Sequence, residues 1–190
     1  MSHVELLTPP LARKPRQTPP SASPALTTLV DEIDAACADI EGPKGARIVA
    51  ALRKAAARPD LLTSDQRTAQ SGCYARHVLH SDPAGRFTIV SIVWNQGQFS
   101  PTHAHHTWCA YAVHENTLEE TLYAWDDVTA TAQPKRKEAR LPGYGCFAPA
   151  GLDQIHRLGN SCAEPAISIH VYGVEREQVC THVNRVVQIA

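Results

Sequence analysis

The sequence lacks several features that would define its class at once. Its 18 Lys and Arg nearly balance 19 Asp and Glu, and a net charge of -1 gives no electrostatic reason to expect nucleic acid or an anionic membrane as a partner. No apolar run approaches the length of a membrane span, and the first residues contain no apolar segment typical of a secretory signal. These absences favour a cytoplasmic protein. With 190 residues, 43% of them hydrophobic, the chain can bury the core of one full domain.

The six cysteines also lack the spacing of a structural motif. No two of them form a C-x-x-C pair, which argues against a zinc ribbon or a dense disulfide framework. We therefore expect most of them to be small buried residues. Cys109 differs because it lies in a chemically suggestive stretch, SPTHAHHTWCAY, which covers residues 100–111.

The composition changes twice along the chain. Residues 1–24 contain six prolines and few large apolar side chains, which predicts a flexible tail. Apolar residues then recur at helical spacing in two segments within about 25–60. From about residue 72, short segments rich in β-branched and aromatic residues, such as RFTIVSIVW and AISIHVYG, alternate with turn signals. The sequence therefore predicts one domain over 25–190, with a helical lead-in and a small antiparallel barrel or sandwich at about 72–190.

Two histidines in the stretch SPTHAHHTWCAY have the spacing of a metal site on a strand. Alternate strand residues face the same side, so His103 and His105 can project into one cavity while Ala104 faces away. His106 falls on the opposite face. Two histidines on one face are weak evidence by themselves, and a third ligand is needed.

Two longer patterns resemble the motifs of the cupin barrels. The stretch from Gly97 to Asn116 has the pattern G-x5-H-x-H-x3-C-x6-N, and residues 143–160 have the pattern G-x5-P-x-G-x4-H-x3-N, with two extra residues before the histidine. The glycines and Pro149 favour tight turns. Asn116 can replace a turn glycine because Asn enters left-handed conformations more easily than most residues. The resemblance implies a mainly β cupin, a small antiparallel β-barrel or jelly roll with an N-terminal helical lead-in.

The cupin resemblance implies a metal held by His103, His105 and His156. Cys109 occupies the position at which many cupins carry a metal-binding glutamate. Three neutral imidazoles leave the full dipositive charge on the metal and coordination positions free on one face, which an anionic substrate and dioxygen could share. Three histidines also suit zinc, which would activate water, so a cupin hydrolase or isomerase stays open as an alternative.

Two stretches, residues 114–125 (HENTLEETLYAW) and 156–173 (HRLGNSCAEPAISIHVYG), resemble the cysteine dioxygenase family more specifically. The likeness covers roughly residues 72–173 and implies a mononuclear Fe(II) on the three histidines. Ser168, His170 and Tyr172 match the family's Ser-x-His-x-Tyr motif. Because SIHVY alternates, the three share one strand face and could form a hydrogen-bonded chain that fixes the His170 tautomer and aims the Tyr172 hydroxyl at the metal. The alternative is that Tyr172 is merely a half-buried strand tyrosine.

The same resemblance implies further site residues. Arg76 matches the arginine that grips the substrate carboxylate, which a guanidinium can do through two parallel hydrogen bonds, and Tyr74 matches a nearby tyrosine. Cys109 matches the cysteine that becomes thioether-linked to Tyr172 in mammalian members, although one residue fewer separates it from the second histidine here. Trp108 could also line the pocket.

The predicted function is a non-haem iron thiol dioxygenase that adds both atoms of O2 to the sulfur of a small thiol. L-cysteine, giving cysteine sulfinic acid, is the first choice, because relatives acting on 3-mercaptopropionate typically carry glutamine in place of Arg76 and glycine in place of Cys109. The alternatives are 3-mercaptopropionate or another mercaptocarboxylate and, more distantly, a cupin that binds a ligand without turnover. We expect a monomer or small homo-oligomer whose partners are a small-molecule thiol and O2.

Overall fold

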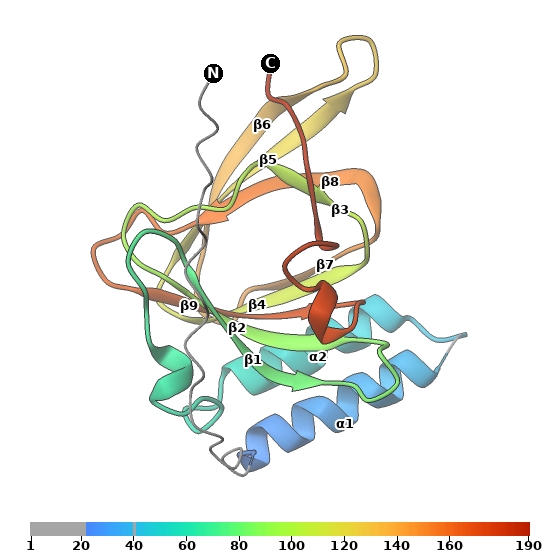
Figure 1. Cartoon of the computed structure of the whole chain (residues 1–190), viewed down its shortest axis with the longest axis vertical. Coiled ribbons are helices and arrows are strands. Elements are labelled where there is room, and N and C mark those ends of the chain that lie inside the picture. Colours follow the sequence, from blue (N-terminus) through green and yellow to red (C-terminus); the bar gives the residue numbers. More distant parts are fainter. Residues whose placement is uncertain (1–21, 40) are drawn as a thin grey trace, which may run out of the picture.

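The computed structural model describes residues 22–39 and 41–190, so the predicted tail over 1–24 lies almost entirely outside the described residues. Two helices, α1 (Pro24–Ala38) and α2 (Lys44–Ala56), precede a series of short strands (Figure 1). The prediction of a mainly β chain with a helical lead-in is confirmed. Among the described residues, no helix is both long and apolar enough to cross a membrane.

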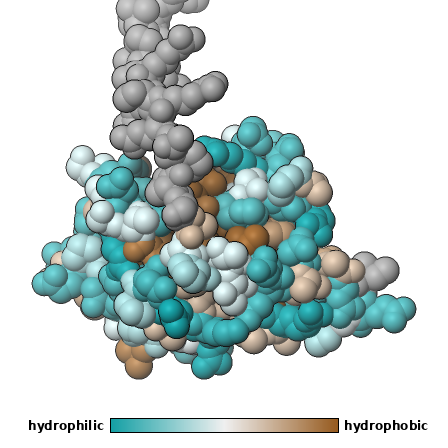
Figure 2. Space-filling model, turned by 90° about the horizontal axis from the view of Figure 1, so that it is seen from below, coloured by the Kyte–Doolittle hydropathy of each residue, from teal (hydrophilic) through white to brown (hydrophobic). Residues whose placement is uncertain are grey.

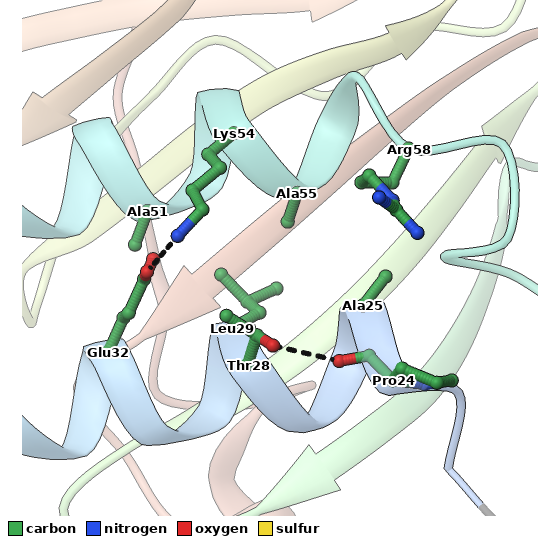
Figure 3. A pocket seen from close by; sticks show the side chains of 9 residues that line it. All are labelled: Pro24, Ala25, Thr28, Leu29, Glu32, Ala51, Lys54, Ala55 and Arg58. Carbon is green, nitrogen blue, oxygen red and sulfur yellow. Dashed lines mark hydrogen bonds and ion pairs between the residues drawn. The ribbon is translucent and has the colours of Figure 1, made fainter.

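The helices form because each buries one apolar stripe. The Ser23 hydroxyl accepts a hydrogen bond from the Leu26 N–H at 3.1 Å and caps α1, and Pro24 occupies the first turn, where its missing N–H costs nothing. Buried residues at helical spacing are Leu26, Leu29 and Ile33 on α1 and Ile48, Leu52 and Ala55 on α2. The two helices leave a groove of about 260 Å³ between them, which a Lys54–Glu32 ion pair bridges (Figure 3). The face of the molecule seen from below Figure 1 is mostly hydrophilic, with a few apolar patches (Figure 2).

The strands form two five-stranded antiparallel sheets. The first sheet has the order β1 (Ala75–Ser81), β2 (Thr88–Trp94), β9 (Ala166–Tyr172), β4 (Cys109–Glu115) and β7 (Gly145–Ala148). The second has the order β10 (Asn184–Val186), β3 (His103–His105), β8 (Gly151–Gly159), β5 (Leu118–Asp126) and β6 (Thr131–Arg140). The helices lie along the outside of the first sheet, and the second sheet lies on its other side (Figure 1). This arrangement confirms the predicted cupin barrel.

Strand alternation separates the structural side chains from the site side chains in the first sheet. Every residue of β2 and β9 is buried, because the sheet is covered on both faces. Ile89, Ile169 and Ala110 pack toward the helices, whereas Trp94 and Tyr172 belong to the inner cluster. The inner face therefore supplies the side chains of the barrel cavity.

The turns confirm the predicted left-handed asparagine. Asn116 has φ 56° between β4 and β5, and its side-chain amide donates to the Pro165 carbonyl at 2.7 Å. Gly97, Gly143 and Gly151 of the two cupin patterns also have positive φ values. The sequence patterns therefore mark real turns.

Candidate metal centre

Three imidazoles gather on the inner face of the second sheet. His103 and His105 lie on β3, and His156 lies directly opposite His103 on β8. The ring centroids are 5.1 Å apart for His103–His105, 4.7 Å for His103–His156 and 5.2 Å for His105–His156. One ring nitrogen from each histidine lies within 4.8 Å of the others, so the three can hold a metal ion.

Burial keeps two of these imidazoles ready for a metal. It lowers the pKa of His103 to about 3 and that of His105 to about 2, with the nearby His156 adding to both shifts. A neutral imidazole has a lone pair for a metal, whereas a protonated one has none. His103 and His105 are therefore neutral at neutral pH and can bind a metal.

Hydrogen bonds fix the orientation of two rings. His103 Nδ1 lies 2.8 Å from the Pro101 carbonyl, and His156 Nδ1 lies 2.6 Å from the Glu120 carboxylate. Because both partners are acceptors, each Nδ1 carries a proton, and Nε2 is the ring nitrogen that can face a metal. His105 Nδ1 is buried without a hydrogen-bond partner among the described residues.

Glu120 is a site residue that the sequence reasoning missed. Its side chain is buried and also accepts a hydrogen bond from Arg140 Nε at 2.6 Å. Burial alone would raise the pKa of the Glu120 carboxyl, but the hydrogen bonds from His156 and Arg140 outweigh it and lower the pKa. The carboxylate is therefore charged and polarises the His156 ring toward a metal.

A hydrogen-bonded chain runs along the inner face of β9. The Ser168 hydroxyl lies 2.8 Å from His170 Nε2, and the Tyr172 hydroxyl lies 3.2 Å from His170 Nδ1. The indole N–H of Trp94 donates to Ser168 Oγ at 2.9 Å. Ser168 Oγ thus accepts a hydrogen bond from Trp94. The Ser168 hydroxyl proton then has His170 Nε2 as the acceptor within reach.

This balance of donors and acceptors assigns the remaining protons. If Ser168 donates to His170 Nε2, then His170 Nδ1–H donates to the Tyr172 oxygen, and the Tyr172 proton points away from His170. Burial lowers the pKa of His170 well below its usual value, with His156 contributing, so the ring is neutral as this assignment requires. Burial, and then Cys109, raise the pKa of Tyr172 well above its usual value, so the hydroxyl keeps its proton.

The three histidines and three residues of this chain, Trp94, His170 and Tyr172, line one small cavity of about 20 Å³, which we call the front cavity. Its other lining residues are Tyr74, Arg76, Ile92, Ser100, Cys109, Leu158 and Asn184. Among the described residues, its lining includes no carboxylate. The front cavity thus combines the Arg76 guanidinium with candidate metal ligands, and this arrangement suits an anionic ligand.

Arg76 has an unused donor in this cavity. Its Nη2 donates to the Tyr74 hydroxyl at 2.9 Å, whereas its Nε is buried without a partner among the described residues. The Tyr74 ring packs against Trp94, with centroids 4.4 Å apart, which limits the movement of this pair. A buried donor without a partner costs about 1–3 kcal/mol, a cost that a bound carboxylate would remove.

Cys109 and Tyr172 lie directly opposite each other on β4 and β9. The Gly173 N–H donates to the Trp108 carbonyl at 3.0 Å, so the backbone hydrogen bonds flank this pair instead of joining it. Side chains approach most closely in pairs of this kind. Burial, and then the nearby Cys146, raise the pKa of the Cys109 thiol well above its usual value.

The prediction that Trp108 lines the pocket is wrong. Its ring stacks on Phe147 at 5.9 Å, and the Lys44 ammonium lies 4.4 Å from its centre, on the helix side of the sheet. Because its neighbour Cys109 faces inward, Trp108 must face outward. Trp94 lines the cavity instead.

Three further histidines of the described residues lie outside the cluster. His106 is exposed. The buried His114 bonds the Ala56 carbonyl through Nδ1 at 2.8 Å, and His77 bonds the Thr68 carbonyl at 2.7 Å. These contacts are structural.

Fold and site together define a cupin with a three-histidine centre able to hold a metal ion. A family model described as cysteine dioxygenase type I matches residues 66–184, more than half of the chain. The protein belongs to the cysteine dioxygenase type I family, as its motifs predicted.

Individual relatives match a shorter region. Cysteine dioxygenase type 1 of Homo sapiens is 32% identical over 90 residues, which cover 46% of this chain and 45% of the human protein. The Mus musculus protein is 31% identical over the same length. The match therefore spans less than half of these relatives.

Two solved cupin-like structures have lower sequence identity to this chain. An RmlC-like cupin with a double-stranded β-helix fold from Methanocaldococcus jannaschii has a TM-score of 0.43 at 13% identity, covering 63% of this chain and 93% of that one. A conserved protein with a double-stranded β-helix domain from Klebsiella pneumoniae has a TM-score of 0.46 at 18% identity, covering 63% and 88%.

Proposed function

We propose that this protein is an Fe(II)-dependent thiol dioxygenase that converts a small mercaptocarboxylate, L-cysteine first, into its sulfinic acid with both atoms of O2. The observation that carries the proposal is a single cavity in which three clustered histidines face an unpaired guanidinium N–H and a tyrosine hydroxyl. Family membership supports the dioxygenase class.

A ferrous ion on His103, His105 and His156 would supply coordination positions at which a thiolate and dioxygen react. The donor set fits such an ion, because hydrogen bonds leave Nε2 of two rings free and burial keeps the imidazoles of His103 and His105 neutral. The family favours iron over zinc as the ion.

Arg76 orients the substrate. Its free Nε–H and its remaining guanidinium donors take the substrate carboxylate, while the Tyr74 hydroxyl holds the guanidinium plane in place. With one arginine and no acidic residue in its described lining, the front cavity fits a thiol with a single carboxylate. 3-Mercaptopropionate meets the same requirement and is the alternative substrate.

Tyr172 controls a proton. The neutral His170 donates to the Tyr172 oxygen, and the tyrosine proton is then available to the reacting atoms in the cavity. The chain Trp94–Ser168–His170 holds this hydroxyl in one orientation before substrate arrives.

Cys109 and Tyr172 form a thioether during turnover. The cross-strand pairing brings the two residues side by side. Bond formation removes one hydrogen from the thiol and one from the ring, and dioxygen accepts the two electrons and two protons and leaves as hydrogen peroxide. The intact mass should fall by two hydrogens, and the thiol should resist alkylation after unfolding. An unchanged mass after many turnovers would contradict this step.

An oxygen-uptake assay with product mass tests the function. Iron-loaded protein should consume O2 with L-cysteine and give a product two oxygen atoms heavier, whereas 3-mercaptopropionate and mercaptosuccinate serve as competing substrates. His105→Ala should lose both metal and activity, and His106→Ala, at the exposed neighbouring position, should keep both. Absence of oxygen uptake with every thiol would refute the proposal. Binding of a thiol without turnover would identify a ligand-binding protein. Hydrolytic activity of the zinc-loaded protein without oxygen uptake would identify a hydrolase.

A further inference from the structure

A second small cavity lies behind the histidine cluster, and we call it the back cavity. It has a volume of about 20 Å³, and its lining residues are His105, Cys109, Tyr111, Glu120, Leu122, Cys146, Ala148, Gln154 and His156. Three of these, His105, Cys109 and His156, also line the front cavity. The two cavities thus adjoin at these three side chains.

The back cavity also adjoins the surface. A larger hollow of about 430 Å³ is lined by residues of β5, β6, β7 and β8 and shares four residues with the back cavity: Glu120, Leu122, Cys146 and Gln154. Gln154 is itself exposed. A series of hollows therefore leads from solvent to the histidines without crossing the front cavity.

Tyr111 indicates that the back cavity holds a ligand. Its side chain is 1% exposed, and its ring stacks on His170 with centroids 5.3 Å apart. Its hydroxyl is buried near the Cys146 thiol but makes no hydrogen bond of ordinary geometry to the described residues, and the residue lines the back cavity. An unpaired buried polar group commonly marks a site that takes a small ligand or a water molecule. About 10–15 Å³ suffices for one water-sized molecule, so the volume fits one small molecule.

The walls favour a neutral occupant. Leu122 and Ala148 are apolar, and burial raises the pKa of Cys146 to about 12, so its thiol is uncharged. The one carboxylate, Glu120, is already bonded to His156 and Arg140. An ion would lose hydration here without gaining a partner.

The front cavity gives the reason for a second entrance. Its volume is only about 20 Å³, so a mercaptocarboxylate bound there leaves no room for a second molecule to pass it. The second reactant then needs another way to the same histidines. We infer that the back cavity admits dioxygen to the centre, passing beside Cys109. This inference rests on the proposed dioxygenase function.

Xenon, an apolar probe of gas-accessible cavities, tests the inference without turnover. Crystals of zinc-loaded wild-type protein under xenon should show a xenon atom in the back cavity. Ala148→Leu, which fills the back cavity and does not line either of the other two hollows, should abolish it. Leu122→Phe serves if Ala148→Leu does not fold, as judged by its thermal unfolding.

Kinetics supply the second readout. Ala148→Leu should raise the KM for O2 several-fold and leave the KM for L-cysteine and kcat at saturating O2 unchanged. Leu158→Phe, the matched control in the front cavity, should raise the KM for L-cysteine instead. Xenon found only in the front cavity, or an unchanged KM for O2 in Ala148→Leu, overturns the inference.

Two further outcomes separate the alternatives. A water molecule bound to the Tyr111 hydroxyl, not displaced by xenon and lost in Tyr111→Phe, would make the back cavity a structural water site and overturn the inference. Absence of oxygen uptake by wild-type protein would refute the proposed function instead, and bound xenon would still show the cavity to be accessible to gas.

Discussion

Replacing Glu120 by glutamine should weaken the metal centre without touching a metal ligand. One carboxylate oxygen of Glu120 lies 2.6 Å from His156 Nδ1 and fixes the orientation of that ring. The other accepts a hydrogen bond from Arg140 Nε at 2.6 Å, so the carboxylate also balances the charge of the guanidinium. Glutamine keeps the size of the side chain but removes the charge. It can also present its NH2 group to His156, which would favour the wrong tautomer.

The magnitude follows from two separate losses. Loss of a residue that supports a metal-bound histidine typically costs 10–100-fold in metal affinity, about 1.4–2.8 kcal/mol. Removing one partner of a buried ion pair costs about 3–5 kcal/mol of stability. Arg140 keeps a second partner, Glu138 at 2.7 Å, so we expect the lower end, about 3 kcal/mol. For a domain of this size that loss lowers Tm by about 6–12 °C.

Anaerobic titration of Fe(II) against a competing chelator measures the first loss, and thermal unfolding of the metal-free protein measures the second. Glu119→Gln is the matched control, because the adjacent carboxylate pairs with the exposed Lys137 at 2.8 Å. Such a surface pair contributes about 0–1 kcal/mol. Wild-type metal affinity in Glu120→Gln would refute the role assigned to this carboxylate.

Three further predictions concern other parts of the chain. Arg76→Ala should raise the KM for L-cysteine roughly 10–100-fold, because charge-assisted hydrogen bonds to its carboxylate contribute about 1.5–3 kcal/mol. The KM for cysteamine, which has no carboxylate, should change little. Equal effects on both KM values in steady-state kinetics would exclude the anchor role of Arg76. Asn116→Ala should lose about 1–2 kcal/mol in urea unfolding because of φ 56°, and Asn116→Gly should lose less. The metal-free protein should lose stability as pH falls from about 6.5 toward 3, because His103 and His105 become protonated in the unfolded chain but stay neutral in the folded protein. Urea unfolding midpoints that do not fall between pH 7 and 5 would contradict this.

Local patterns predicted the parts of the site that depend on spacing within one strand. His103-x-His105 and Ser168-x-His170-x-Tyr172 needed only the two-residue repeat of a strand. The same repeat, applied to Cys109, would have excluded Trp108 from the cavity.

Glu120 could not be found in this way. Its neighbour Glu119 has the same side chain, so the sequence alone does not tell which of the two glutamates faces the barrel interior. That depends on the pairing of β5 with β8, in which Leu122 lies opposite His156. A strand's register is a property of two segments and is not encoded in either one alone. β6 escaped prediction for a related reason: it is an edge strand, so its sequence TAQPKRKEAR is charged and tolerates Pro134.

The pairing of Cys109 with Tyr172 has a consequence for the lifetime of the protein. A covalent bond between them would close a loop of about 60 residues, and in the chain-entropy model such a closure stabilises the folded state by about 4 kcal/mol. Molecules that have turned over would then unfold less readily than newly made ones. In a mixed population, catalytic history would set resistance to heat and proteases, and the idle molecules would be removed first.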